Sequence, residues 1–148
     1  MVNEKLNLKL HGRNLDDLKV ISAYLQDSIV SVKDIVFLKK NKTFLMLVNR
    51  FMWEDVEKGV FRQNKRISSA ITFNNVKKVI SKNINQKNKE RALELLTIKS
   101  FLPTDNSYQI QLIFAGDNLI TIFAEIIDVL LDDIGKPHSV KKTPKHTV

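Results

Sequence analysis

The sequence predicts an α+β fold built on a mostly antiparallel sheet of about seven to eight strands. Several short segments alternate apolar and polar residues, which is typical of strands with one buried face. Only two segments show the apolar period of a helix, one in the N-terminal half and one near the C-terminal end. No long helix separates the middle strands, so a parallel doubly wound sheet is not expected.

The most specific architecture that this pattern suggests is a rolled sheet or barrel closed by the last helix, as in pleckstrin-homology-like domains. An open sheet with both helices on one face is the alternative. The chain has 148 residues, 43% of them hydrophobic, which is enough for one domain with a real core. We expect this single domain to span residues 1–135 and to be followed by a mobile basic tail, 136–148.

The first elements carry clear local signals. Residues 5–10 alternate with one apolar face and predict an edge strand. Asn14 is a good N-cap for a helix that runs to about Asp27, because Asp16 and Asp17 then fall in its first turn, where the helix dipole favours them. Residues 28–33 predict a short strand or linker.

A hairpin is predicted next, at the centre of the fold. Its strands are Ile35–Leu38 and Thr43–Val48, and the polar break between them contains Asn41. Both faces of these strands are apolar, so we expect Leu47 on one face and Met46 on the other to be buried.

The remaining strands follow from alternation and breaks. They are expected at residues 66–73, 76–82, 93–101, 107–115 and 119–123, with a polar loop at 83–91. The final element, about 124–134, is predicted to be a helix. Its apolar stripe includes Ile127, Leu130 and Ile134, and its four acids, Asp133 among them, are expected to face water.

No catalytic or metal-binding pattern is present. Cysteine is absent, the three histidines are far apart, and no phosphate-binding or dinucleotide-binding glycine motif occurs. We therefore predict no catalytic residues, no metal and no cofactor. An enzyme is the third choice, and it would have to work with Asp, Glu, Lys, Arg or Tyr alone.

One cluster follows the hairpin and suggests a binding site. Arg50, Trp53 and Glu54 lie close in sequence, and Arg62 and Arg66 follow. In one interpretation they form an aromatic and cationic recognition patch. In the other, which we favour, Trp53 closes the end of the core and Arg50 pairs with Glu54.

The net charge of +8 suggests a second kind of partner. Between residues 58 and 91 there are ten basic residues, including Arg62, Lys65, Arg66, Lys77 and Lys78, and one acid. Such a segment is able to contact phosphates. Its only aromatic residues are Phe61 and Phe73, and Phe73 is expected to point inward, so we favour a solvated lysine-rich face.

Short pieces of the sequence resemble a known family. They are Leu25-Gln26-Asp27, Asn49-Arg50-Phe51 with Trp53-Glu54, Phe114-Ala115-Gly116 and Asp133-Ile134-Gly135. They are similar to a family of small bacterial single-domain proteins that is known only as a domain of unknown function. The resemblance covers nearly the whole chain and implies one domain and a bacterial cytoplasmic origin, but no activity or ligand.

These observations lead to a functional prediction. No apolar run approaches the roughly 20 residues that a membrane span needs, and the absence of cysteine fits the cytoplasm. We predict a non-enzymatic binding or adaptor module that acts through its sheet surface on a protein partner. Weak nucleic-acid binding through the basic face around residues 58–91 is the alternative.

Overall fold

The structure is a computed structural model that describes residues 7–54 and 65–139. The elements in chain order are β1 (Lys9–Gly12), α1 (Leu15–Leu25), β2 (Ser28–Ser31), the 3-10 helix η1 (Val32–Asp34), β3 (Ile35–Leu38), the 3-10 helix η2 (Lys39–Asn41), β4 (Thr43–Phe51), β5 (Lys65–Phe73), β6 (Val76–Lys82), β7 (Ala92–Thr104), β8 (Ser107–Phe114), β9 (Asn118–Ala124), β10 (Val129–Asp133) and β11 (His138–Ser139).

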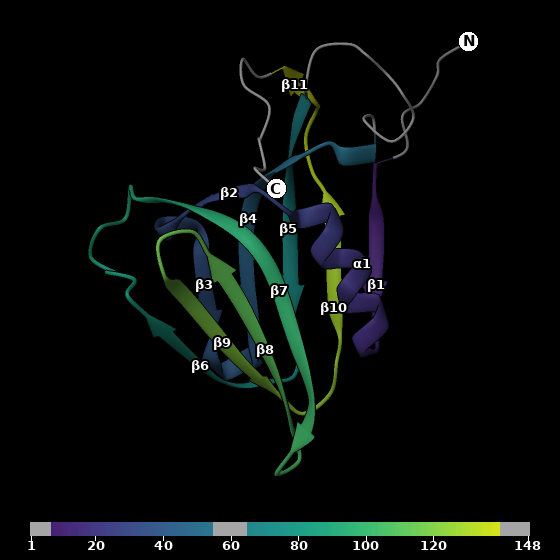
Figure 1. Cartoon of the computed structure of the whole chain (residues 1–148), viewed down its shortest axis with the longest axis vertical. Coiled ribbons are helices and arrows are strands. Elements are labelled where there is room, and N and C mark those ends of the chain that lie inside the picture. The colour runs from purple at the N-terminus through teal and green to yellow at the C-terminus, as the bar shows by residue number, and fades with distance from the viewer. Residues whose placement is uncertain (1–6, 55–64, 140–148) are drawn as a thin grey trace.

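All pairings between the described strands are antiparallel and join them into one strongly curved sheet (Figure 1). The strand order is β1-β10-β5-β4-β2-β7-β8-β9-β6. Two short strands lie outside this order: β3 pairs with β4, and β11 pairs with β5. The α+β class and the antiparallel sheet are thus confirmed. The sheet is open rather than a closed barrel, because its path ends at β1 and at β6. It has 11 strands instead of seven or eight.

The helix α1 has the cap that the sequence predicts. The Asn14 side chain accepts a hydrogen bond from the Asp17 backbone N–H, and Asp16 and Asp17 occupy the first turn. Leu18, Ile21 and Leu25 are buried against the sheet. The helix comes close to β1 because Gly12 has no side chain. A Cβ there would lie only 2.9 Å from Ile21 Cδ1.

The core lies on the concave side of the sheet. Each strand contributes alternate residues to it, and Met46, Ile71, Leu112, Ile122 and Leu131 are each 0% exposed. The hairpin of β3 and β4 is present, but the prediction that both of its faces are buried is wrong. Leu47, on the convex face, is 41% exposed. The strand β4 still lies inside the sheet, between β5 and β2, although its convex face is not covered.

The predicted C-terminal helix is also wrong. Residues 129–133 form β10, which fills the space between β1 and β5. The inward side chains alternate at Ile127, Val129, Leu131 and Asp133, whereas Ile126 and Ile134 are exposed. The same apolar residues fit a helical stripe and a strand. The strand forms because ladders on both sides satisfy its backbone hydrogen bonds. Beyond it, β11 pairs with β5, and residues 140–148 of the predicted tail lie outside the described residues.

Candidate functional site

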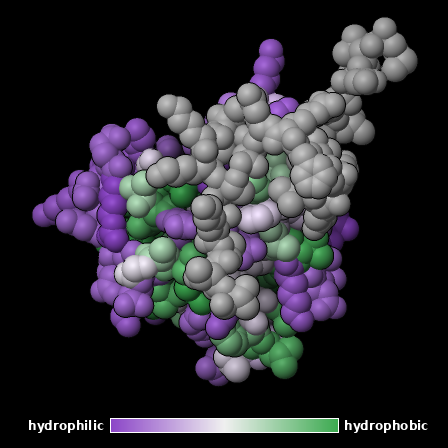
Figure 2. Space-filling view, turned by 45° about the horizontal axis from the view of Figure 1, so that its top comes forward, coloured by the Kyte–Doolittle hydropathy of each residue, from purple (hydrophilic) through white to green (hydrophobic). Residues whose placement is uncertain are grey.

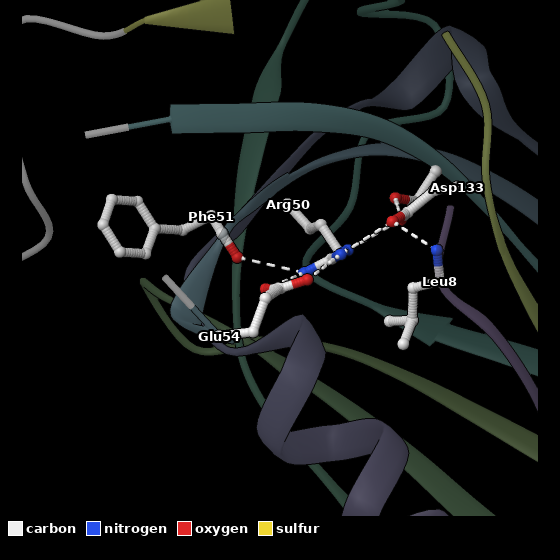
Figure 3. A network of polar contacts seen from close by, with 6 residues as sticks. Leu8, Arg50, Phe51, Glu54 and Asp133 are labelled. Atoms are coloured by element: carbon white, nitrogen blue, oxygen red, sulfur yellow. Dashed lines mark hydrogen bonds and ion pairs between the residues drawn. The ribbon is translucent and has the colours of Figure 1, made fainter. Parts of the chain in front are cut away.

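Arg50, the centre of the cluster after the hairpin, is fully buried in a polar network (Figure 3). It lies on the concave face of β4, the same face as the buried Val48 and Met46. Asp133 reaches it from β10 and Ser69 from β5. The ring of Tyr24, on α1, lies with its centroid 5.8 Å from the guanidinium carbon of Arg50. The network therefore lies within the fold, where α1 meets the sheet.

Every N–H of the Arg50 guanidinium has an acceptor. Nε and Nη2 donate to the two oxygens of Asp133 at 2.8 and 2.7 Å. Nη1 and Nη2 donate to the two oxygens of Glu54 at 2.8 and 2.6 Å, and Nη1 also donates to the Phe51 carbonyl at 3.4 Å. A guanidinium has five N–H donors, so the set is complete.

Asp133 is satisfied in the same way. Its Oδ1 also accepts a hydrogen bond of 2.6 Å from the Ser69 hydroxyl, and its Oδ2 accepts one of 3.1 Å from the Leu8 backbone N–H. Burial alone would raise the pKa of the Asp133 carboxyl, but the bonds from Arg50 and Ser69 outweigh it and hold this pKa below its ordinary value. Glu54 has a lowered pKa for the same reason, since burial opposes ionisation and Arg50 favours it.

Burial by itself would lower the pKa of Arg50, yet the hydrogen bonds that it donates to Glu54 and Asp133 raise this pKa above its ordinary value. All three groups are thus ionised, and the two carboxylates exceed the single guanidinium by one negative charge. The ion pair between Arg50 and Glu54 is present. Because Arg50 has no free donor and no exposed surface, the network holds the fold together and does not present a cation to a ligand.

Trp53 and Arg66, two other members of the predicted cluster, also form hydrogen bonds within the fold. The Trp53 indole N–H donates to the Gln26 carbonyl at 2.8 Å, and its ring centroid lies 4.6 Å from that of Phe51. Arg66 Nη1 donates to the carbonyls of Asp27 and Asn49, and burial lowers its pKa although Asp27 and Glu94 oppose this shift. Arg62 lies outside the described residues.

The lowered pKa values predict a particular loss of stability in acid. Glu54 and Asp133 stabilise the folded state above their ordinary pKa values of 4.5 and 3.8. As the pH falls below these values, the carboxyls bind protons in the unfolded chain while they remain ionised in the folded protein. The free energy of unfolding therefore falls until the pH reaches the folded pKa values. Urea midpoints measured from pH 7 to pH 2.5 should therefore decline steeply below about pH 4.5.

A matched pair of variants checks this origin. Glu54→Gln should flatten the decline, whereas Glu125→Gln should leave it unchanged, because Glu125 is exposed and forms an exposed ion pair with Lys42 at 3.5 Å. If the urea midpoint falls equally with pH in the two variants and the unmodified chain, Glu54 is not a source of the acid sensitivity.

The described basic residues of the segment 58–91 are divided between two strands. Lys65 and Arg66 begin β5, whereas Lys77 and Lys78 lie on β6, at the far end of the strand order. Although β6 follows β5 in sequence, Lys65 is eight residues from the end of β5, or roughly 27 Å along the strand. The two pairs of basic residues therefore lie well apart in the described structure.

A different surface gathers the lysines of β6 with aromatic side chains. It is the convex face of the last four strands of the path, β6-β9-β8-β7, and we call it the four-strand face. Cross-strand pairing defines three rows on it: Lys78, Phe123, Gln109 and Phe101; Ile80, Thr121, Gln111 and Lys99; Lys82, Leu119, Ile113 and Thr97. None of these residues is acidic.

Two features make the four-strand face chemically distinctive. Phe101 is 44% exposed, and the Lys78 ammonium lies 5.7 Å from the centroid of the Phe123 ring. A shallow hollow beside the β8–β9 turn is lined in part by Gln111, Ile113 and Lys82. Rings, amides and ammonium groups thus alternate across one surface. Sequence reasoning missed this set, because Phe101, Phe123 and Lys99 lie outside the basic segment and are joined to it only by strand pairing.

The described residues contain neither a cluster of metal ligands nor a membrane-spanning helix. Within residues 7–54 and 65–139, no three His, Cys, Asp or Glu side chains are gathered as metal ligands would be. No helix in this part of the chain is long and apolar enough to cross a membrane.

Comparison with known proteins gives a family and no relative of known activity. Neither the curated proteins nor the solved structures contain a match to the chain. A family model described as "Protein of unknown function (DUF2948)" matches residues 8–146, which is nearly the whole chain. The match agrees with the resemblance in the sequence and with the single sheet that runs through the described residues. The chain therefore belongs to the DUF2948 family of proteins of unknown function.

Proposed function

We propose that this protein is a non-enzymatic binding module that takes up single-stranded nucleic acid on the four-strand face. The observation that carries the proposal is the first row of that face, in which Lys78, Phe123, Gln109 and Phe101 lie side by side across four strands. Proteins that bind single strands combine stacking aromatic rings with cations that follow the backbone, often on a sheet.

The spacing of the rings suits separate bases. Phe123 lies on β9 and Phe101 on β7, with Gln109 of β8 between them, so the backbones that carry the two rings are about 10 Å apart, or two strand spacings. At this distance the rings do not cover each other, and each offers a face or an edge to a different base. The Gln109 amide between them has both a donor and an acceptor for base edges.

The charges surround these rings. Lys78 and Lys82 lie on the edge strand β6, and Lys99 lies on β7 at the other side of the face. Lys77 lies beside them and donates to the Ser107 hydroxyl at 2.9 Å. An anionic backbone therefore meets cations on both sides and no carboxylate between them, which is the electrostatic arrangement that phosphate contacts require.

A protein partner, the first function that the composition suggests, would use a different surface. On the convex side of β3 and β4, Val36 and Leu47 are 40% and 41% exposed, and Val36 pairs with the partly buried Leu45. This patch is apolar but carries no feature that selects a particular partner. The four-strand face has a defined chemistry, so we place the function there.

Binding of a labelled single-stranded oligonucleotide, measured by fluorescence anisotropy at about 50 mM salt, tests the proposal. Phe101→Ala should weaken binding by roughly 5- to 150-fold, because stacking on an aromatic ring contributes about 1–3 kcal/mol per base. Lys78→Glu should also weaken binding. The affinity of the unmodified chain should fall as salt rises, with a slope of about −0.7 per phosphate contacted.

Neighbouring residues provide controls. Leu102→Ala removes an apolar side chain that is 76% exposed next to Phe101, and Lys9→Glu reverses a charge on β1, at the other end of the strand order. Neither should change the affinity by more than about twofold, since neither residue belongs to the rows. The proposal fails if no saturable binding occurs, or if Leu102→Ala and Phe101→Ala are equivalent.

A further inference from the structure

A cavity of about 260 Å³ lies on the other side of β6, where the sheet remains open. In the described part of the chain, β3 pairs only with β4 and β6 pairs only with β9, so the two strands present free edges toward the cavity. The side chains of β6 divide between its faces. Val79 and Ser81 point into the cavity, whereas Lys78, Ile80 and Lys82 belong to the four-strand face.

Hydrogen bonds between backbone groups hold both ends of the cavity. At one end the Val76 N–H donates to the Lys42 carbonyl at 2.8 Å, so β6 starts against the turn of the hairpin. At the other end the Lys33 N–H donates to the Lys89 carbonyl at 3.0 Å, and the Val32 N–H donates to the Arg91 carbonyl at 2.9 Å. The loop between β6 and β7 is thus fixed to η1, and the cavity is formed before any ligand arrives.

The lining is apolar inside and polar at one end. The apolar residues are Val32, Ile35, Phe37, Phe44, Val79, Ile84 and Ile120. The polar ones are Ser81, Gln86 and Lys89, and none of the lining residues is acidic. In Figure 1 the loop that carries Gln86 and Lys89 lies at the left, and in Figure 2 this side of the molecule is a hydrophilic projection next to hydrophobic surface.

The three polar side chains are arranged as donors. The Gln86 amide donates to the Ser81 hydroxyl oxygen at 3.3 Å, which leaves the hydroxyl hydrogen free to donate elsewhere. The neighbouring Glu90 does not neutralise Lys89, because its carboxylate pairs with Lys33 at 3.2 Å. Among the described residues no carboxylate forms an ion pair with Lys89.

From this geometry we infer that the cavity binds a small carboxylic acid with an apolar body. The carboxylate lies at Lys89 and Ser81, and the hydrocarbon part lies among Val79, Ile84 and Phe44. A volume of about 260 Å³ is below the range for drug-sized ligands, so the ligand is a short chain or a single ring. The site is separate from the four-strand face and does not depend on nucleic-acid binding.

Titration of the full-length protein with hexanoate, followed by NMR chemical shifts of its isoleucine and valine methyl groups, tests the inference. We expect saturable shifts of lining methyls such as those of Val79 and Ile84. Affinity should rise about fourfold for each CH₂ group from butanoate to hexanoate, since each buried CH₂ contributes to transfer from water. Hexanol should bind at least about tenfold more weakly than hexanoate, because it lacks the charge-assisted hydrogen bonds.

Two exposed lysines of the same loop separate the site from general charge effects. Lys89→Gln should weaken hexanoate binding at least about tenfold, whereas Lys87→Gln should not, because Lys87 does not line the cavity. Both positions are exposed, so both variants are expected to fold. The inference is overturned if hexanoate causes no saturable shifts, if hexanol binds equally well, or if the two lysine variants behave alike.

Discussion

Replacing Asp133 by alanine is expected to reduce the free energy of unfolding by about 3–5 kcal/mol, the cost of removing one partner from a buried ion pair. The variant would leave the Ser69 hydroxyl, the Leu8 N–H and two N–H groups of Arg50 without their acceptor. Asp132→Ala provides a matched control, because Asp132 is adjacent on β10 and lies on its opposite face. Urea denaturation of both variants measures the difference, and the control should lose less than about 1 kcal/mol.

A double-mutant cycle examines the same network more closely. Arg50→Leu alone leaves two carboxylates buried around an apolar side chain, so it should destabilise the protein at least as much as Asp133→Ala. The combination of Arg50→Leu with Asp133→Leu should cost clearly less than the sum of the single changes, because it removes both buried charges and leaves only the partly exposed Glu54 of the network without its cation. Additive effects would contradict the description of the network as one unit.

The second large effect is expected in the core of β4. Met46 is 0% exposed and lies on the concave face, opposite Ile71 of β5. Met46→Ala should cost about 2–5 kcal/mol, because it removes buried methylene and methyl groups and leaves a cavity. The measurement is again the free energy of unfolding in urea.

Leu47→Ala is the matched comparison for this change. The two residues are neighbours on one strand, but Leu47 is 41% exposed on the convex face. Its truncation should cost less than about 1 kcal/mol. Equal losses for Met46→Ala and Leu47→Ala would mean that the convex face of β4 is covered in solution.

Much of the secondary structure was predictable because its signals are local. The cap at Asn14 with its two following acids defines the start of α1, and the alternation at residues 66–73 and 107–114 defines β5 and β8. The break at residues 39–42 defines the hairpin, where η2 and the left-handed Lys42 make the turn. In each case a few neighbouring residues determine the conformation without help from the rest of the chain.

The errors concern features that depend on distant partners. Residues 124–134 carry apolar side chains at positions that suit a helix as well as a strand, and the ladders to β1 and β5 decide between the two. The helical stripe places Asp133 on the opposite, solvated face, and burial of an isolated carboxylate would indeed be costly. Arg50, separated from it by 83 residues, removes that cost.

The candidate site was also only partly predictable. The pairing of Arg50 with Glu54 follows from their spacing of four residues, and the structure contains it. The rows of the four-strand face depend instead on the registers of β6, β9, β8 and β7. No local signal in the sequence predicts that Lys78 lies beside Phe123, 45 positions away, because the pairing of β6 with β9 brings them together.

The Arg50 network also determines when the protein is able to fold during its synthesis. Asp133 closes the network near the C-terminal end of the described chain, and the same carboxylate accepts from Leu8, 125 residues earlier. A ribosome that adds about 5–20 residues per second exposes the Arg50 guanidinium for several seconds before its partner emerges. Until then the Arg50 guanidinium has Glu54 but not Asp133 as an ionic partner, and the sheet lacks the strand that separates β5 from β1. The native sheet therefore forms only after β10 has been synthesised, and chains that terminate before β10 should be substrates for chaperones and proteases.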